Sequence, residues 1–196
     1  PENPTKGRMT SCISGWTCYT INFVKLKEYG LDELYTNFDP GSGGALNAAI
    51  SGAFAKGKPI FSYYWTPTPL MGKAEIDMIR LEEPAYTADC WGAMSVVVED
   101  IKANGQEAYV PSCACEYKDM ALTKTVRADW AAANPDLAAF IKAYALPTET
   151  VNSMLAYYAD ESEGDMEATA VHFLSSSSVW ESWVPADVAA KVKSAL

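Results

Sequence analysis

The first 65 residues alternate between short apolar runs and stretches with helical spacing. Residues 8–11, 34–38 and 60–65 have the length and side-chain alternation of strands. Residues 19–29 and 45–55 place apolar side chains at helical spacing, and Gly30 supplies a stop after the first of them. This order of elements predicts an α/β fold.

The rest of the chain divides into a mixed region and a helical region. Three more apolar runs are interpreted as strands, at residues 76–81, 94–98 and 120–126, and residues 101–105 as a short helical turn. From Arg127 onward the pattern is helical, and proline or acidic residues mark several helix starts. The predicted helices are residues 129–133, 136–145, 148–158, 165–174 and 188–196.

Composition excludes several classes of protein. The formal net charge is −10 and the pI is near 4.5, which argues against nucleic acid, whose phosphates need a basic face. No apolar run is long enough to predict a membrane-spanning helix. No cofactor motif is found, and the acidic run at residues 160–163 lacks the alternation of a calcium loop. We therefore expect neither a cofactor nor a metal.

The segment Cys12-Ile13-Ser14-Gly15-Trp16-Thr17-Cys18 lies where a predicted strand turns into a predicted helix. The first backbone N–H groups of a helix are unsatisfied, and together with the helix dipole they favour an anion. A disulfide between Cys12 and Cys18 would close a small ring and hold the turn rigid. Trp16 would then stand beside an anion-binding position.

A binding position for a carboxylate next to a tryptophan suits a betaine. A quaternary ammonium has no N–H to donate, so it is held against aromatic faces by cation–π attraction. Trp65 ends a predicted strand, where ligands gather in open α/β sheets, and can form a second wall. Strand alternation puts Tyr63 on the side of Trp65 and Tyr64 on the other, so at most one of them is expected to share that side. Both are expected to be packing residues, and ligand binding by Tyr63 or Tyr64 is the alternative.

Several motifs together resemble the glycine betaine/proline betaine-binding proteins of ABC importers. They are Cys-x-x-Gly-Trp-x-Cys followed by Ile-Asn, the Asp-Pro-Gly-Ser-Gly turn, Gly-Lys-Pro-x-Phe-x-Tyr-Tyr-Trp-Thr-Pro, and a closing Trp-Val-Pro-Ala-Asp-Val. The resemblance runs from about Arg8 to the end of the chain. It implies that Trp16 and Trp65 are two walls of an aromatic cage, and that the backbone amides of Thr17 and Cys18 hold the carboxylate.

The resemblance also implies an architecture and partners. The expected fold is the bilobal periplasmic-binding-protein-like fold of type II, truncated to most of the second lobe and the C-terminal helical part of the first. Residues 1–112 would form the second lobe, and residues 113–196 the hinge crossing and the returning part of the first lobe. The third cage wall would lie in the missing part. The implied partners are a betaine and the transporter's permease, at a periplasmic or other extracytoplasmic location, with the membrane met only through the permease.

Five cysteines leave their pairing partly open. A Cys12–Cys18 bond favours an oxidising compartment. Cys90 is expected to pair with Cys113 or Cys115, and the remaining cysteine to be free or bonded to a missing segment. Zinc is the alternative, although Cys-x-Cys is tighter than the usual ligand spacing and no histidine is near.

Two other classes of function compete with solute binding. A thiol-dependent enzyme or redox protein would use Cys18 as nucleophile, with His172, the only histidine, as base. It needs a free Cys18, and a packing role suits His172 better. A sensory or structural domain of the same fold is the third hypothesis. The preferred methylated solute is left open by the sequence.

Overall fold

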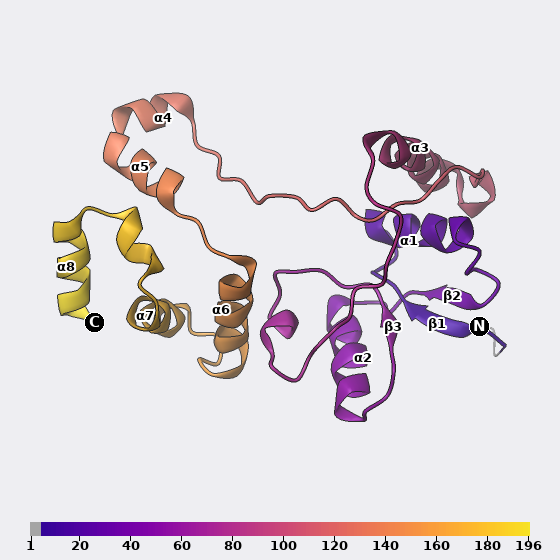
Figure 1. Ribbon diagram of the computed structural model, residues 1–196, viewed down its shortest axis with the longest axis horizontal. Coiled ribbons are helices and arrows are strands. Elements are labelled where there is room, and N and C mark those ends of the chain that lie inside the picture. Colours follow the sequence, from indigo (N-terminus) through magenta and orange to yellow (C-terminus); the bar gives the residue numbers. More distant parts are fainter. Residues whose placement is uncertain (1–4) are drawn as a thin grey trace. The chain divides into compact units, whose positions relative to one another are not determined.

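The computed structural model describes residues 5–196, which contain both α-helices and a small parallel sheet. The chain divides into two compact units (Figure 1). Unit 1 comprises the chain up to Trp65 together with Asp77–Asp119, and unit 2 comprises Thr66–Ile76 and Met120–Leu196. The chain therefore passes from one unit to the other three times.

Unit 1 is built on three parallel strands in the order β2-β1-β3. They are β1 (Gly7–Thr10), β2 (Tyr35–Phe38) and β3 (Phe61–Ser62). Met9 on β1 pairs with Asn37 of β2 and with Phe61 of β3, so β1 is the central strand. The three strands expected in residues 8–65 are all present, and β3 is shorter than predicted.

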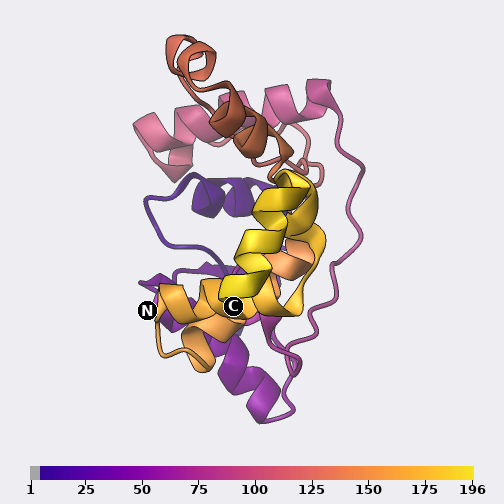
Figure 2. The ribbon, with the colours of Figure 1, turned by 90° about the vertical axis from the view of Figure 1, so that its left-hand side faces the viewer.

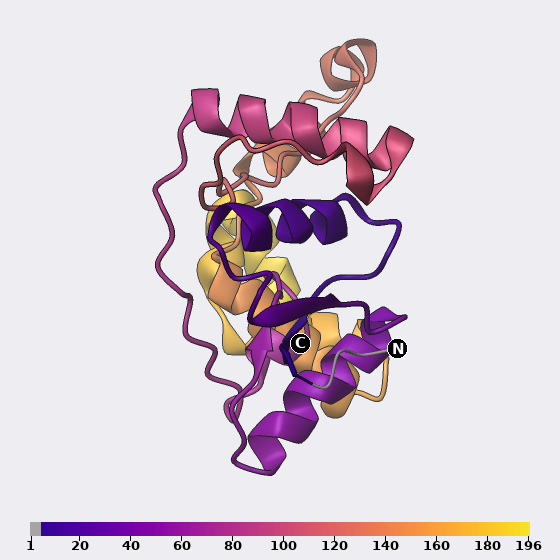
Figure 3. The same ribbon diagram turned by 90° about the vertical axis from the view of Figure 1, so that its right-hand side faces the viewer.

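Three helices complete unit 1: α1 (Thr17–Glu28), α2 (Gly43–Ala55) and α3 (Ala88–Asn104). Figures 1 and 3 show α1 between the sheet and α3, with α2 on the other face of the sheet. The main core lies where α1 packs on α3, and it consists of Ile21, Val24, Met94, Val97, Val98, Ile101 and Ala114. A parallel sheet with helices on both faces is the layer arrangement of an α/β fold.

Three predicted strands are wrong. Residues 94–98 lie inside α3, which is capped by the Thr87 hydroxyl and ended by Gly105 at φ +93°. Their apolar side chains at positions 94, 97, 98 and 101 have helical spacing, and this outweighs the β preference of the valines. Residues 76–81 and 120–126 form no strand among the described residues. Apolar side chains such as Ile79 and Leu122 are exposed there, so they do not pack into a core.

Unit 2 is helical, as predicted. Its helices are α4 (Ala128–Ala133), α5 (Pro135–Ala143), α6 (Thr148–Asp160), α7 (Met166–Ser176) and α8 (Ala186–Ala195). Figure 2 shows the last of them, α8, in yellow, leading to the C-terminus. The core of this unit contains Trp180, Trp183 and Ala189, and the Trp180 indole N–H donates to the Leu174 carbonyl at 2.9 Å. In residues 5–196 no helix is both long and apolar enough to cross a membrane.

Candidate functional site

The turn between β1 and α1 is closed by a disulfide. Cys12 and Cys18 are bonded with their Cα atoms 6.1 Å apart, and Cys12 is completely buried. Within the ring the Trp16 N–H donates to the Ile13 carbonyl at 3.0 Å. Gly15 lies at φ +90°, a region that favours glycine, so the tight turn depends on it. The ring presents the next residues at a fixed place on the unit.

Trp16 occupies the N-cap position of α1, and its indole is 48% exposed. Its side chain makes no capping hydrogen bond, although its carbonyl accepts from the Tyr19 N–H at 3.0 Å. Among residues 5–196, no acceptor bonds the backbone N–H of Thr17 or of Cys18. The first turn of α1 also has no acidic side chain to satisfy them. Two donors at the positive end of a helix are thus available to an anion.

Trp65 meets Trp16 across the surface of unit 1. The two ring centroids are 5.9 Å apart and the rings are inclined at 61°, so one indole presents its edge to the face of the other. Trp65 is 36% exposed. The Tyr63 N–H donates to the Thr10 carbonyl at 2.9 Å, so β3 pairs with β1 until two residues before Trp65. The sheet therefore brings the two tryptophans together although 49 residues separate them in the sequence.

Both neighbouring tyrosines contact Trp65, whereas strand alternation alone would place only Tyr63 on its side. Tyr64 stacks on it with centroids 4.9 Å apart, and Tyr63 lies at 6.1 Å with a tilt of 32°. The reason is that β3 ends at Ser62, so strand alternation no longer governs Tyr63 to Trp65. The Tyr64 hydroxyl donates to the Asn47 side chain at 2.7 Å, and burial raises the pKa of Tyr63. The exposed indole is thus braced by two rings.

A buried polar group of residues supports this aromatic cluster. Tyr117 lies 5.5 Å from Tyr63 and donates its hydroxyl to Asn22 at 2.8 Å, and Asn22 donates to Ser11 at 3.0 Å. The Lys25 ammonium stands 4.1 Å from the centre of the Tyr117 ring. Burial of the phenol raises the pKa of Tyr117 far above its ordinary value.

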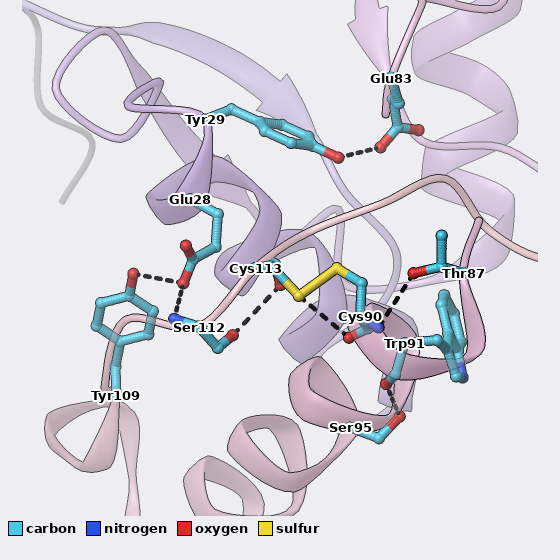
Figure 4. The surroundings of a disulfide bond; sticks show 10 residues. All are labelled: Glu28, Tyr29, Glu83, Thr87, Cys90, Trp91, Ser95, Tyr109, Ser112 and Cys113. Atoms are coloured by element: carbon cyan, nitrogen blue, oxygen red, sulfur yellow. Dashed lines mark hydrogen bonds between the residues drawn. A yellow bond between two sulfur atoms is a disulfide. The ribbon is translucent and has the colours of Figure 1, made fainter. Parts of the chain in front are cut away.

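Lys25 is a buried charge with a defined partner. It is 6% exposed and forms an ion pair with Glu83 at 2.6 Å, and Glu83 also accepts from the Tyr29 hydroxyl at 2.8 Å (Figure 4 shows this second bond). Desolvation lowers the pKa of Lys25, and Glu83 opposes that shift. Sequence reasoning missed Lys25, Asn22 and Tyr117. The first two break the apolar stripe of α1, and polar residues on a buried helix face signal such a network.

The second disulfide joins Cys90 at the start of α3 to Cys113, and Cys115 is a free, buried cysteine. In Figure 4 the bond lies beside Thr87, which caps α3, and Ser112, whose N–H donates to Glu28 at 2.7 Å. The part of the chain that the structure describes holds no cluster of three metal-ligating side chains. Because the sulfur atoms of Cys90 and Cys113 are bonded to each other, neither is a thiolate of the kind that the alternative zinc site would need.

Trp91 and His172 both pack against other rings. Trp91 contacts Tyr117 with centroids 5.8 Å apart and lies against the core of unit 1. His172, in unit 2, stacks on Tyr157 at 3.8 Å with nearly parallel rings. The thiol-enzyme hypothesis is wrong because Cys18 is bonded to Cys12 and has no thiol to act as nucleophile.

The chain matches a known protein family. Residues 1–176 match the OpuAC family, described as the substrate binding domain of ABC-type glycine betaine transport system. No curated protein matches the chain. The match covers most of the chain and includes the Cys12–Cys18 turn, the aromatic cluster and helices α1 to α7. This is a family of binding proteins, not of enzymes.

Proposed function

The chain belongs to the family of substrate-binding domains of ABC-type glycine betaine transport systems, and from this membership we propose that unit 1 carries its betaine-binding site. One observation carries the proposal: the exposed indoles of Trp16 and Trp65 meet beside the unsatisfied first turn of α1. An aromatic surface and an anion position thus lie next to each other.

The two halves of a betaine match the two halves of this site. The methylated nitrogen cannot donate a hydrogen bond, and it would rest against the faces of Trp16 and Trp65. The carboxylate would accept hydrogen bonds from the backbone N–H groups of Thr17 and Cys18, at the positive end of the helix. Because the two rings are inclined at 61°, they form a corner rather than parallel walls, so further walls would complete a cage.

Tyr63 and Tyr64 are the next candidates for contact with the ligand. Both rings touch Trp65, and neither is fully buried. Their first role in this proposal is to hold the indole in place. Direct contact with the methyl groups is the second.

The proposed architecture is that of a bilobal periplasmic-binding-protein-like fold of type II. Residues 1–112 would belong to the second lobe, and residues 113–196 to the hinge crossing and the returning part of the first lobe. The two lobes would close on the ligand by hinge motion and present it to the permease of an ABC importer. Two disulfides favour an extracytoplasmic location.

Titration calorimetry with glycine betaine tests the proposed site. Trp16→Ala and Trp65→Ala should each weaken binding by about 1–2 kcal/mol, through loss of cation–π contact. Trp16→Phe and Trp65→Phe are the matched comparisons, because each keeps an aromatic face at the same position and should weaken binding less than the alanine substitution. Unchanged affinity in both alanine variants would refute the assignment of these two residues.

A further inference from the structure

The indole of Trp65 is held by the ring of Tyr64, and the hydroxyl of Tyr64 is held in turn by a helix of the same unit. The two rings stack with their centroids 4.9 Å apart and their planes inclined at 30°. The Tyr64 hydroxyl donates to Asn47 Oδ1 at 2.7 Å. Asn47 lies in the second turn of α2, which Ser42 caps through the Ala45 N–H. A capped helix is thus connected to the exposed indole through one hydrogen bond and one stacked ring.

This stacking decides which face of the Trp65 indole a ligand can reach. The phenol ring of Tyr64 covers one face of the indole, so that face is closed to methyl groups. Trp65 is 36% exposed, and an exposed indole that nothing held would turn between rotamers, each with a different face toward solvent. Cation–π attraction acts over the face of a ring, so the orientation of the indole matters for binding. Holding one orientation also lowers the entropy lost when the ligand binds.

The other tyrosine beside Trp65 is held by a different helix. Tyr63 lies 5.5 Å from Tyr117, whose hydroxyl donates to Asn22 of α1 at 2.8 Å. Figures 1 and 3 show α1 and α2 on opposite faces of the sheet. The two tyrosines that contact Trp65 are therefore anchored on opposite faces, and loss of one anchor leaves the other in place.

We propose that Asn47 is a positioning residue for Trp65: by holding the Tyr64 hydroxyl it keeps the phenol stacked on the indole and fixes the face that is offered to the methylated nitrogen. The inference rests on the proposed function, because it assumes that Trp65 contacts this nitrogen. Residues 47, 64 and 65 all belong to unit 1, so the contacts that carry the effect lie within one compact unit. The effect of Asn47 passes through Tyr64.

Calorimetric titration with glycine betaine in a double-mutant cycle tests this role. Asn47→Leu has the same branched shape without the acceptor, and it should weaken binding about fivefold because one of the two anchors is lost. Asn47→Asp keeps an acceptor oxygen for the hydroxyl and should bind like the parent protein. Tyr64→Phe breaks the same hydrogen bond from the other side, so adding it to Asn47→Leu should weaken binding no further. In the Trp65→Ala background, Asn47→Leu should have no effect on affinity.

Asn104→Leu is the matched control, because the Asn104 side chain donates to Asp100 of its own helix, α3, at 2.6 Å, and its loss should leave affinity unchanged. Unchanged affinity in Asn47→Leu, an equal loss in Asn47→Asp, or an equal loss with and without the Trp65 indole would overturn the positioning role. Unchanged affinity in Trp65→Ala would instead overturn the proposed site. If Asn47→Leu does not fold, Tyr64→Phe, which keeps the stacked ring, takes its place in the cycle.

Discussion

The indoles of Trp16 and Trp65 meet edge to face, with their centroids 5.9 Å apart. The contact depends on two independent elements of unit 1. The Cys12–Cys18 ring sets the position of Trp16, and the pairing of β3 with β1 sets that of Trp65. A change in either element should therefore alter ligand binding as well as stability.

Removal of either disulfide should lower the free energy of unfolding, and the two losses should differ. Replacing Cys12 and Cys18 by serine opens a ring with a sequence separation of 6, whereas replacing Cys90 and Cys113 opens one of 23. The chain-entropy model gives about 2 kcal/mol for the first and about 3.5 kcal/mol for the second. Chemical denaturation of both double variants measures these losses.

Betaine affinity should show the opposite order. The Cys12–Cys18 ring fixes Trp16 and the first turn of α1, while the Cys90–Cys113 bond fixes α3. We expect the first double variant to bind glycine betaine more weakly and the second to bind normally once folded. Equal affinity in the two would show that the ring does not organise the site.

Gly72 is expected to be intolerant of a side chain. Gly72→Ala would force a Cβ against the Asn152 carbonyl and the Ala156 side chain, and such overpacking costs about 1–3 kcal/mol of unfolding free energy. Gly52→Ala is the matched control, because Gly52 lies inside α2 with open space around it. Alanine there should add up to about 1 kcal/mol. Thermal unfolding of the two variants shows whether Gly72→Ala lowers stability and Gly52→Ala raises it. A Gly72→Ala protein as stable as the parent would contradict the close approach of Gly72 to the Asn152 carbonyl.

Much of unit 1 could be predicted because local signals agreed with the tertiary structure. The Cys12–Cys18 turn has a strand before it and a helix after it, and Ser42 caps α2 through the Ala45 N–H. Residues 94–98 failed because three consecutive valines suggest a strand, while burial of every third or fourth side chain makes the run helical.

The aromatic contacts were only partly predictable. The residues Trp16 and Trp65 stand out in the sequence, but their contact depends on strand pairing across 49 residues. The hydrogen bond between Thr66 and Asn152 could not be predicted, since the two residues are 86 residues apart. Long-range polar contacts of this kind leave no local periodicity.

Buried tyrosines should make the protein sensitive to alkali. Desolvation raises the pKa values of Tyr29, Tyr63 and Tyr117, and the Glu83 carboxylate adds to the shift of Tyr29. A phenol whose pKa is raised on folding keeps its proton in the native state while the unfolded chain loses it. Stability should therefore fall as the pH rises above 10.

Absorbance of tyrosinate measures this directly. These phenols should ionise only as the protein unfolds, so a late step in the absorbance should coincide with loss of helical circular dichroism. Tyr117→Phe should make the late step smaller and the loss of stability with pH less steep. A titration completed with the helices intact would contradict the burial of these side chains.

Binding of glycine betaine should depend little on salt. Indole faces and backbone amides act at contact distance, and the zwitterionic ligand has no net charge. Raising the salt from about 0.1 M to about 1 M shortens the screening length from about 10 Å to about 3 Å, which weakens mainly long-range attraction. Choline is the matched comparison, because it has the same methylated nitrogen without the carboxylate and would feel the net charge of −10. Whatever affinity choline has should fall with salt. A tenfold loss for glycine betaine itself would mean that charged side chains, rather than Trp16, Trp65 and the first turn of α1, hold the ligand.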